Sequence, residues 1–219
     1  MIRKKYILFD LDGTLTDPAL GITNSVMYSL KKFGISVSDR SDLYKFIGPP
    51  LWESFINYYG FTREEANKAV EYYREYFKDI GIFENVVYTG IDDLLCSLVC
   101  KNKILILATS KPEIYAKRIL KHFNLDRYFS FVAGSELDGT RIDKQEVIRY
   151  ALRESNVVDL SLAVMIGDRE YDIIGAKKAG IDSIGVLYGY GSPSELQNAG
   201  ADYIVNDIND LITLFDADT

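Results

Sequence analysis

The sequence predicts an α/β fold, with a Rossmann-like three-layer core built on a parallel sheet and a helical unit inserted into that core. Two observations predict this class. Short apolar runs alternate with helix-length segments, and one long interval near the N-terminus holds no run that reads as a strand. Continuous apolar runs are typical of strands buried on both faces, and strand–helix–strand repetition implies right-handed parallel crossovers.

Six short apolar runs are the predicted strands. They are Tyr6–Phe9, Ile104–Ala108, Phe131–Ala133, Ala163–Ile166, Ser183–Leu187 and Tyr203–Val205. The helices predicted between them are Pro112–Phe123, Lys144–Ser155, Tyr171–Ala179 and Pro193–Ala199. Proline suits the first helical turn because its missing N–H has no partner there in any case. With 219 residues, 47% of them apolar, the chain is long enough to bury a sizeable core.

One interval, from about Asp17 to Glu84, breaks this alternation. Its segments of helical periodicity are Ile22–Phe33, Leu51–Tyr59 and Thr62–Lys78. Thr62 followed by Glu65 is the pattern of a capping box at a helix start. We therefore predict a helical unit over residues 18–85, inserted into a core made of residues 1–17 and 86–219.

Composition argues against several classes of function. Asp and Glu total 32 against 25 Lys and Arg, and a net charge of −7 disfavours a general nucleic-acid binder. No apolar run approaches the ~18 residues of a membrane span, and the N-terminal run is too short for a signal peptide, so we expect a cytoplasmic protein. Cys96 and Cys100 are expected to pack as small apolar residues, and His122, the one histidine, is given no catalytic role.

Two carboxylates directly follow the first predicted strand. Asp10 and Asp12 precede Gly13, and the carboxyl ends of parallel strands are where ligands bind in open α/β sheets. Carboxylates at such a position are costly unless a metal, a substrate or hydrogen bonds satisfy them. Taken alone, the same residues also fit a solvated Asp-Gly turn.

Later strand ends carry groups of complementary chemistry. They are Thr109, Ser110 and Lys111 after the second run, Lys144 at the start of a helix, and Asp168 and Asp172 after the fourth run. A hydroxyl and a cation can bind phosphoryl oxygens, and carboxylates suit Mg²⁺, which takes one or two of them together with phosphate and water. Because these groups recur at successive strand ends, a chance match is improbable.

These motifs resemble those of the haloacid dehalogenase-like phosphohydrolase superfamily, over nearly the whole chain. The matching positions are Asp10–Thr14 for its first motif, Thr109 for the second, Lys144 for the third, and Gly167, Asp168 and Asp172 for the fourth. The helical insertion resembles the family's α-helical cap. Lys45–Leu51 and Gly189–Ser192 are similar to the phosphoglycolate phosphatase and bacterial 5′-nucleotidase branch, which often carries Asn where this chain has Ser110.

The resemblance implies a Mg²⁺-dependent phosphatase that hydrolyses small phosphorylated metabolites, such as phosphoglycolate or nucleoside 5′-monophosphates. Asp10 would be the nucleophile that forms an aspartyl-phosphate, and Asp12 the general acid and base. Three further sets of roles are implied. The Asp10 carboxylate, the Asp12 carbonyl and Asp168 would bind the metal, Asp172 would hold Lys144 or a metal-bound water, and Gly13, Thr109, Ser110 and Lys144 would bind the phosphoryl group.

The sequence says less about which residues contact the substrate beyond its phosphoryl group. Lys45 and Gly48 in the insertion, and Lys111 in the core, are candidate substrate contacts, although Lys45 equally fits an exposed lysine beside a tight turn. The aromatic residues at 72, 73, 76 and 77 are expected to pack the insertion rather than stack on a nucleobase. The alternatives are a phosphomutase of the β-phosphoglucomutase type and a non-catalytic, phospho-dependent regulatory protein. We expect a monomer or weak homodimer with no membrane or nucleic-acid partner.

Overall fold

The computed structural model describes residues 2–215, which divide into two compact units. Within that range the larger unit holds residues 2–16 and 87–215, and the smaller unit spans Asp17–Val86. Within residues 2–215, no helix has both the length and the apolar character that crossing a bilayer requires.

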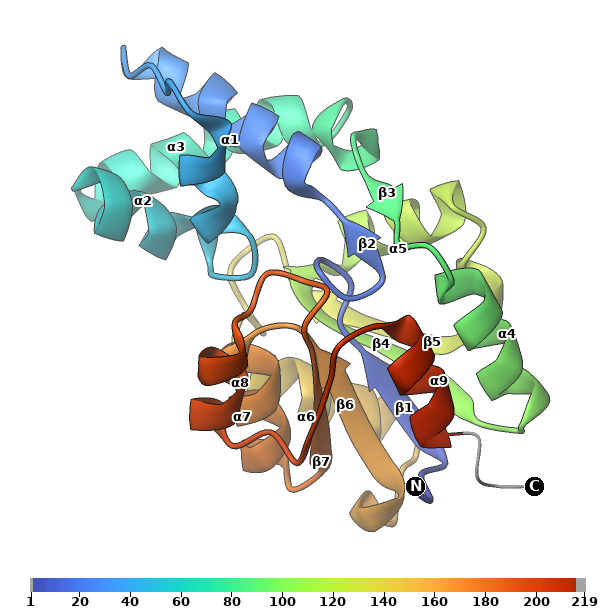
Figure 1. The fold of residues 1–219 in the computed structure, drawn as a ribbon. Coiled ribbons are helices and arrows are strands. Elements are labelled where there is room, and N and C mark those ends of the chain that lie inside the picture. Colours follow the sequence, from blue (N-terminus) through green and yellow to red (C-terminus); the bar gives the residue numbers. More distant parts are fainter. Residues whose placement is uncertain (1, 216–219) are drawn as a thin grey trace. The chain divides into compact units, whose positions relative to one another are not determined.

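The larger unit is built on a six-stranded parallel sheet with the order β5-β4-β1-β6-β7-β8 (Figure 1). The strands are β1 (Tyr6–Phe9), β4 (Ile104–Pro112), β5 (Phe129–Ser135), β6 (Ala163–Gly167), β7 (Asp182–Val186) and β8 (Tyr203–Val205). All six predicted strands are therefore present. In the register, Phe9 lies opposite Leu107 of β4 and Ile166 of β6, so the chain leaves the middle of the sheet at Asp10.

Helices cover both faces of this sheet. They are α4 (Ile91–Cys100), α5 (Glu113–His122), α6 (Lys144–Glu154), α7 (Glu170–Ala179), α8 (Pro193–Ala199) and α9 (Ile208–Phe215), with short 3₁₀ turns at Asp126–Tyr128 and Leu160–Leu162. Leu8, Ile106 and Met165 pack in one cluster with buried residues of α6 and α7. Leu105 and Leu107 alternate with Ile106 and so point to the opposite face, where α4 contacts β4 and α9.

The larger unit adds two helices to those named from the sequence and corrects one prediction. The helix α4 precedes the second predicted strand, and α9 follows the last one. Cys96 and Cys100 lie on α4 but are exposed, so the prediction that they pack in the interior is wrong. The buried face of α4 is formed instead by Leu94, Leu95 and Leu98, together with Ile91.

The smaller unit consists of helices, as predicted. They are α1 (Ala19–Lys32), α2 (Leu51–Tyr59) and α3 (Arg63–Phe77), with the 3₁₀ segments η1 (Arg40–Phe46) and η2 (Gly81–Phe83). Two short strands, β2 (Thr16–Asp17) and β3 (Val86–Val87), pair where the chain enters and leaves it. The predicted capping box at the start of α3 is confirmed: the Thr62 hydroxyl accepts from the Glu65 N–H at 3.2 Å, and the Glu65 carboxylate accepts from the Thr62 N–H at 2.8 Å.

Aromatic side chains fill the interior of the smaller unit. The rings of Phe46 and Phe55, both buried, have their centroids 5.1 Å apart. Tyr73 and Phe77 are also buried, and their rings stack at 5.2 Å. The aromatic residues of α3 therefore contribute to packing, as the sequence indicated, and such pairs add about 0.5–1.5 kcal/mol beyond the area that they bury.

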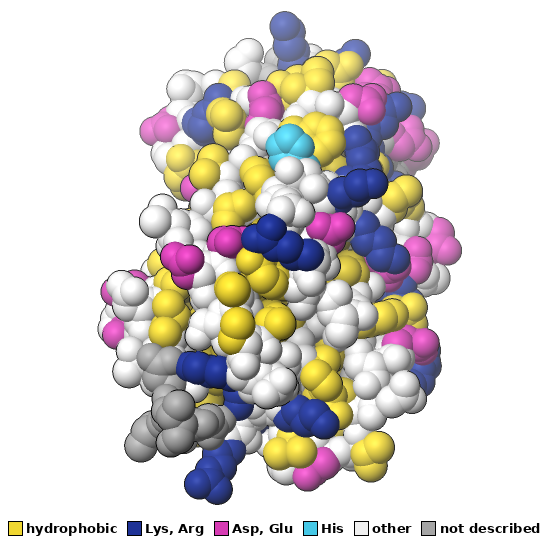
Figure 2. Space-filling view, turned by 90° about the vertical axis from the view of Figure 1, so that its right-hand side faces the viewer, with side chains coloured by type: hydrophobic (Ala, Val, Ile, Leu, Met, Phe, Trp, Pro, Cys, Tyr) yellow, Lys and Arg dark blue, Asp and Glu magenta, His cyan; other side chains and the backbone are white. Residues whose placement is uncertain are grey.

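The surface mixes charges of both signs. On the face shown in Figure 2, Lys and Arg side chains lie among Asp, Glu and apolar side chains. Many of the exposed charges are paired, for example Lys117 with Glu113 at 2.6 Å and Arg127 with Asp92 at 2.8 Å. Exposed pairs of this kind contribute little to stability.

Candidate active site

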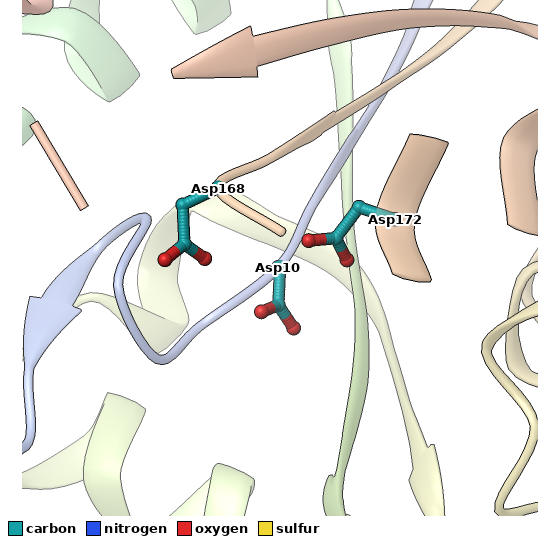
Figure 3. A group of neighbouring side chains, drawn as sticks. All are labelled: Asp10, Asp168 and Asp172. Carbon is teal, nitrogen blue, oxygen red and sulfur yellow. The ribbon is translucent and has the colours of Figure 1, made fainter. Parts of the chain in front are cut away.

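Three buried carboxylates meet beyond the carboxyl ends of β1 and β6 (Figure 3). Asp10 follows β1 directly and its N–H donates to the Ile166 carbonyl at 2.9 Å, which extends the strand pairing by one residue. Asp168 follows β6, and Asp172 lies in the first turn of α7. One oxygen from each carboxylate lies within 4.8 Å of the others, so the three form a single acidic cluster.

Lys144 is the cation of this cluster. Its Nζ lies 2.7 Å from an oxygen of Asp10 and 2.7 Å from an oxygen of Asp172, and it donates to the Ala108 carbonyl at 3.2 Å. The position of Lys144 depends on the start of α6, where the Asp143 side chain accepts from the Gln145 N–H at 2.8 Å. The structure thus brings together residues that are 134 positions apart in the chain.

Glycines let the backbone approach these carboxylates closely. Gly13 has a φ of +82°, and a Cβ there would lie 2.2 Å from Asp168 Oδ2. A Cβ on Gly167 would lie 2.2 Å from the Asp172 Cγ. Any side chain at either position would therefore displace a carboxylate of the cluster.

Burial dominates the electrostatics of the cluster. It raises the pKa of Asp168 well above the ordinary value, and it raises the pKa of Asp172 to about 6 although Lys144 opposes the shift. Burial alone would lower the pKa of Lys144, but Asp10 and Asp172 raise it above its usual value. Three buried carboxylates face one ammonium here, and that imbalance of charge and oxygen donors fits a divalent cation such as Mg²⁺.

Asp12 lies beside the cluster with a different partner. Lys111 Nζ lies 2.8 Å from its Oδ1 and 2.7 Å from its Oδ2. Burial raises the pKa of Asp12, and the Lys111 charge opposes that shift. Lys111, a candidate substrate contact in the sequence analysis, therefore contacts the carboxylate of Asp12.

The candidate phosphate-binding residues lie at the same edge of the sheet. Thr109 is buried at the end of β4, next to β1, and its hydroxyl accepts from the Lys111 N–H at 3.3 Å. The carbonyl of Ser110 accepts from the Ser135 hydroxyl at 2.8 Å, which ties this segment to β5. The N–H of Gly13 donates to the Thr16 carbonyl at 2.8 Å and closes the turn after Asp12.

Lys45 and Gly48 belong to the smaller unit. The Lys45 Nζ lies 4.4 Å from the centre of the Tyr58 ring, a cation–π contact. Gly48 has a φ of +105° in the turn before α2, a conformation that favours glycine.

Sequence reasoning missed the loop that supports Asp168. The Tyr190 N–H donates to Asp168 Oδ2 at 2.8 Å, and the Tyr188 hydroxyl donates to the Thr14 carbonyl at 3.0 Å. This loop therefore links the first motif to the fourth. The available signal was the segment Gly189–Ser192, which was interpreted only as similar to the family branch, and Tyr188, one residue before it, lies outside that segment.

Comparison with known proteins agrees with this geometry. The family model described as haloacid dehalogenase-like hydrolase matches residues 7–186. A 5′-nucleotidase from Pseudomonas aeruginosa is 48% identical over 196 residues, which cover 90% of this chain and 88% of that protein. A crystal structure of a predicted phosphatase from Clostridium acetobutylicum is 55% identical, with a TM-score of 0.93 and 98% of each chain covered.

A further relative carries the name of another activity. Tyrosine-protein kinase PtkA from Mycobacterium tuberculosis is 38% identical over 185 residues, which cover 84% of this chain but 62% of that protein. Relatives named phosphoglycolate phosphatase match at 24–28% identity over almost the whole chain. The family model, the nucleotidase and the carboxylate cluster agree: this chain belongs to the haloacid dehalogenase-like hydrolases and is a phosphatase of that family.

Proposed function

We propose that this phosphatase hydrolyses small phosphate monoesters with the help of Mg²⁺, through an aspartyl-phosphate on Asp10. Phosphoglycolate and nucleoside 5′-monophosphates are the substrates proposed. The observation that carries the proposal is the buried Asp10–Lys144–Asp172 arrangement, with both nitrogen–oxygen distances at 2.7 Å and Asp168 completing the acidic cluster. A lysine held against a carboxylate at a ligand-binding sheet edge can orient and neutralise a phosphoryl group as that carboxylate attacks it.

The reaction divides into two displacements. In the first, an oxygen of Asp10 attacks phosphorus, the bond to the ester oxygen breaks, and Asp12 gives its proton to the leaving alkoxide. In the second, Asp12 takes a proton from water as the water oxygen attacks phosphorus. The bond between phosphorus and Asp10 then breaks, which releases phosphate, restores the Asp10 carboxylate and leaves Asp12 protonated for the next cycle.

The metal would be held by the carboxylates of Asp10 and Asp168 and by the carbonyl of Asp12. When bound, Mg²⁺ cancels the repulsion between an anionic ester and the attacking carboxylate. Asp172 contributes by holding Lys144 in place. Thr109, Ser110, Gly13 and Lys144 are the proposed phosphate-binding residues.

We propose that the smaller unit sets the choice of substrate as a cap. The residues assigned to the chemistry lie in the larger unit. The smaller unit has its own hollow of about 430 Å³, whose lining includes Arg40, Tyr44 and Phe83. Aromatic rings in a hollow suit an organic group better than a bare phosphate, and the Arg40 guanidinium there already donates to Thr23 and Asn24. Lys45 and Gly48 are further proposed contacts.

Transfer to an acceptor other than water is the second candidate function. The relative named as a tyrosine kinase supports it, and a phosphomutase would use the same aspartyl-phosphate. Incubation with a sugar 1-phosphate, and separately with a tyrosine peptide and a nucleoside triphosphate as phosphoryl donor, separates these cases. Release of free phosphate alone supports hydrolysis, whereas a sugar 6-phosphate or a phosphopeptide supports transfer.

A panel of phosphate esters, assayed for released phosphate with and without Mg²⁺, tests the main proposal. We expect Mg²⁺-dependent turnover of one or more small monoesters. Failure to hydrolyse any small ester, with Mg²⁺ present and the protein folded, would contradict it.

A further inference from the structure

Lys111 and Asp12 form an ion pair beyond the carboxyl ends of the central strands of the sheet. The single ammonium lies within 2.8 Å of both oxygens of the carboxylate. The side chains are 7% and 13% exposed, so little water competes for the contact. A pair shielded in this way is stronger and better ordered than a surface ion pair.

The shape of β4 brings Lys111 to this position. The strand β4 continues to Pro112, whereas its neighbour β1 ends at Phe9, opposite Leu107. Over this extension the register of β4 against β5 shifts between Ala108 and Pro112. One hydrogen bond within the segment and one to β5 fix it: the Lys111 N–H donates to the Thr109 hydroxyl, and the Ser110 carbonyl accepts from the Ser135 hydroxyl. A Cβ on Gly134 would lie 2.6 Å from the Lys111 carbonyl, so β5 also approaches closely.

Lys144 and Lys111 contact different carboxylates of the site. Lys144 contacts Asp10 and Asp172, whereas Lys111 contacts Asp12. A carboxylate on a short side chain rotates unless a donor fixes it, and a general acid must lie within hydrogen-bond reach of the leaving oxygen. A donor that spans both oxygens holds the plane of the group.

We propose that Lys111 is a positioning residue that orients the Asp12 carboxyl group for proton transfer. This inference rests on the proposed function, because it needs Asp12 to act as general acid. When Asp12 carries a proton, Lys111 donates to the oxygen without it, and the O–H is directed at the leaving oxygen. As the phosphorus–oxygen bond breaks, that proton moves to the leaving alkoxide and Lys111 stays bound to the resulting carboxylate.

The test compares two leaving groups in Lys111→Met, which keeps the length of the side chain without its charge. An alkoxide needs a proton as it leaves, whereas p-nitrophenolate leaves as a stable anion. We therefore expect Lys111→Met to lower kcat/KM for glycerol 2-phosphate at least about 10-fold more than for p-nitrophenyl phosphate. Asp12→Asn should show the same selectivity, and Lys111→Arg should recover most of the activity on the alkyl ester.

A double-mutant cycle separates positioning from direct phosphate binding. If Lys111 acts through Asp12, adding Lys111→Met to Asp12→Asn costs little further activity. Equal losses on both esters, or additive losses in the double variant, would overturn the proposal and assign Lys111 to the phosphoryl group. Lys117→Met, which removes an exposed lysine from its pair with Glu113, is the matched control and should leave both activities unchanged.

Two further readouts keep the outcomes distinct. Melting temperatures show whether each variant is folded, and Lys111→Leu, which also lacks the charge and the N–H donors, replaces Lys111→Met if the latter unfolds. Wild-type protein that hydrolyses neither of these esters nor any other small ester of the panel with Mg²⁺ would overturn the proposed function together with this inference. Wild-type activity on both esters, with selective loss in Asp12→Asn but not in Lys111→Met or Lys111→Leu, would overturn the role of Lys111 alone.

Discussion

The two units of this protein bury different kinds of side chain. In the larger unit, the buried side chains include the carboxylates of Asp10, Asp168 and Asp172 and the ammonium of Lys144. In the smaller unit, the polar side chains buried among the described residues are hydroxyls of Thr and Ser, and aromatic rings make up much of its interior. Burying charge costs far more free energy than burying an aromatic ring or a hydrogen-bonded hydroxyl.

The difference indicates which unit is shaped by chemistry and which by packing. Lys4 shows what a structural buried charge looks like, because it pairs with Asp182 at 2.6 Å and donates to the Ser161 carbonyl at 2.6 Å. The acidic cluster differs, since one lysine contacts two of its three carboxylates. An arrangement of that kind is retained for function rather than for stability.

Removal of the nucleophile should have the largest effect. Asp10→Asn is expected to lower kcat for any phosphate ester by about 10³-fold or more, because an amide is a poor nucleophile and a poor metal ligand. The fold should survive, since Lys144 keeps its contact with Asp172. Steady-state kinetics and circular dichroism measure the two effects. Activity within tenfold of wild type would rule out a covalent intermediate on Asp10.

Removal of the metal ion should also lower the activity, because the proposed metal ligands lie in the larger unit. EDTA is expected to abolish turnover and Mg²⁺ to restore it. Ca²⁺ should substitute poorly, because its longer bonds and variable coordination disturb the in-line geometry. The check is phosphate release after chelation and after each metal is added back. Full activity in EDTA, in protein shown to be metal-free by elemental analysis, would refute the proposed site.

Lys45→Ala tests whether the smaller unit selects substrates. We expect kcat/KM for the best natural ester to fall about 10-fold relative to that for p-nitrophenyl phosphate, since one pocket contact is worth about 1–3 kcal/mol of discrimination. Lys68→Ala removes another lysine of the same unit, exposed and paired with Glu71, and should change neither value. Equal losses on the two esters would mean that Lys45 does not select substrates, and its contact with Tyr58 would then be structural.

The smallest effect is expected from the capping box of the smaller unit. Thr62→Ala should lower the free energy of unfolding by about 1 kcal/mol, because an N–H at the start of α3 loses its side-chain acceptor. Thr213→Ala is the control: that hydroxyl donates to the carbonyl four residues earlier in α9, so its loss should matter little. Thermal melts measure both. A change in kcat on p-nitrophenyl phosphate in Thr62→Ala would show that packing in the smaller unit affects the chemistry.

Much of the fold could be predicted from the sequence because its main strands are continuous apolar runs. The interval Tyr6–Phe9 is a strand with the predicted bounds. The strand β4 continues four residues past Ala108, through polar residues that read as a loop, because its extension depends on pairing with β5. For the cysteines a local signal existed: the spacing of Ile91, Leu94, Leu95 and Leu98 places the buried face of α4 away from Cys96 and Cys100.

The members of the acidic cluster could be predicted from the sequence, and so could the contact of Asp172 with Lys144, but the pairing of Lys111 with Asp12 could not. Motif spacing identified Asp10, Lys144, Asp168 and Asp172, because carboxyl ends of parallel strands meet at one edge. It could not identify the carboxylate that Lys111 contacts, since Asp12 lies 99 residues away and other acids are close by. The pairing of Lys111 with Asp12 depends on the register of β4, and the strand propensity of individual residues does not determine that register.

The pairing of β2 with β3 has a consequence for how such proteins diversify. Because Thr16–Asp17 and Val86–Val87 lie side by side, the chain returns to the point from which it left, and the Tyr88 N–H donates to the Leu15 carbonyl at 3.1 Å. The gene segment for residues 17–86 can therefore be lengthened, shortened or exchanged without altering the strand order of the sheet. Recombination at these two positions would replace the whole of the smaller unit while leaving the sheet and the acidic cluster of the larger unit unchanged.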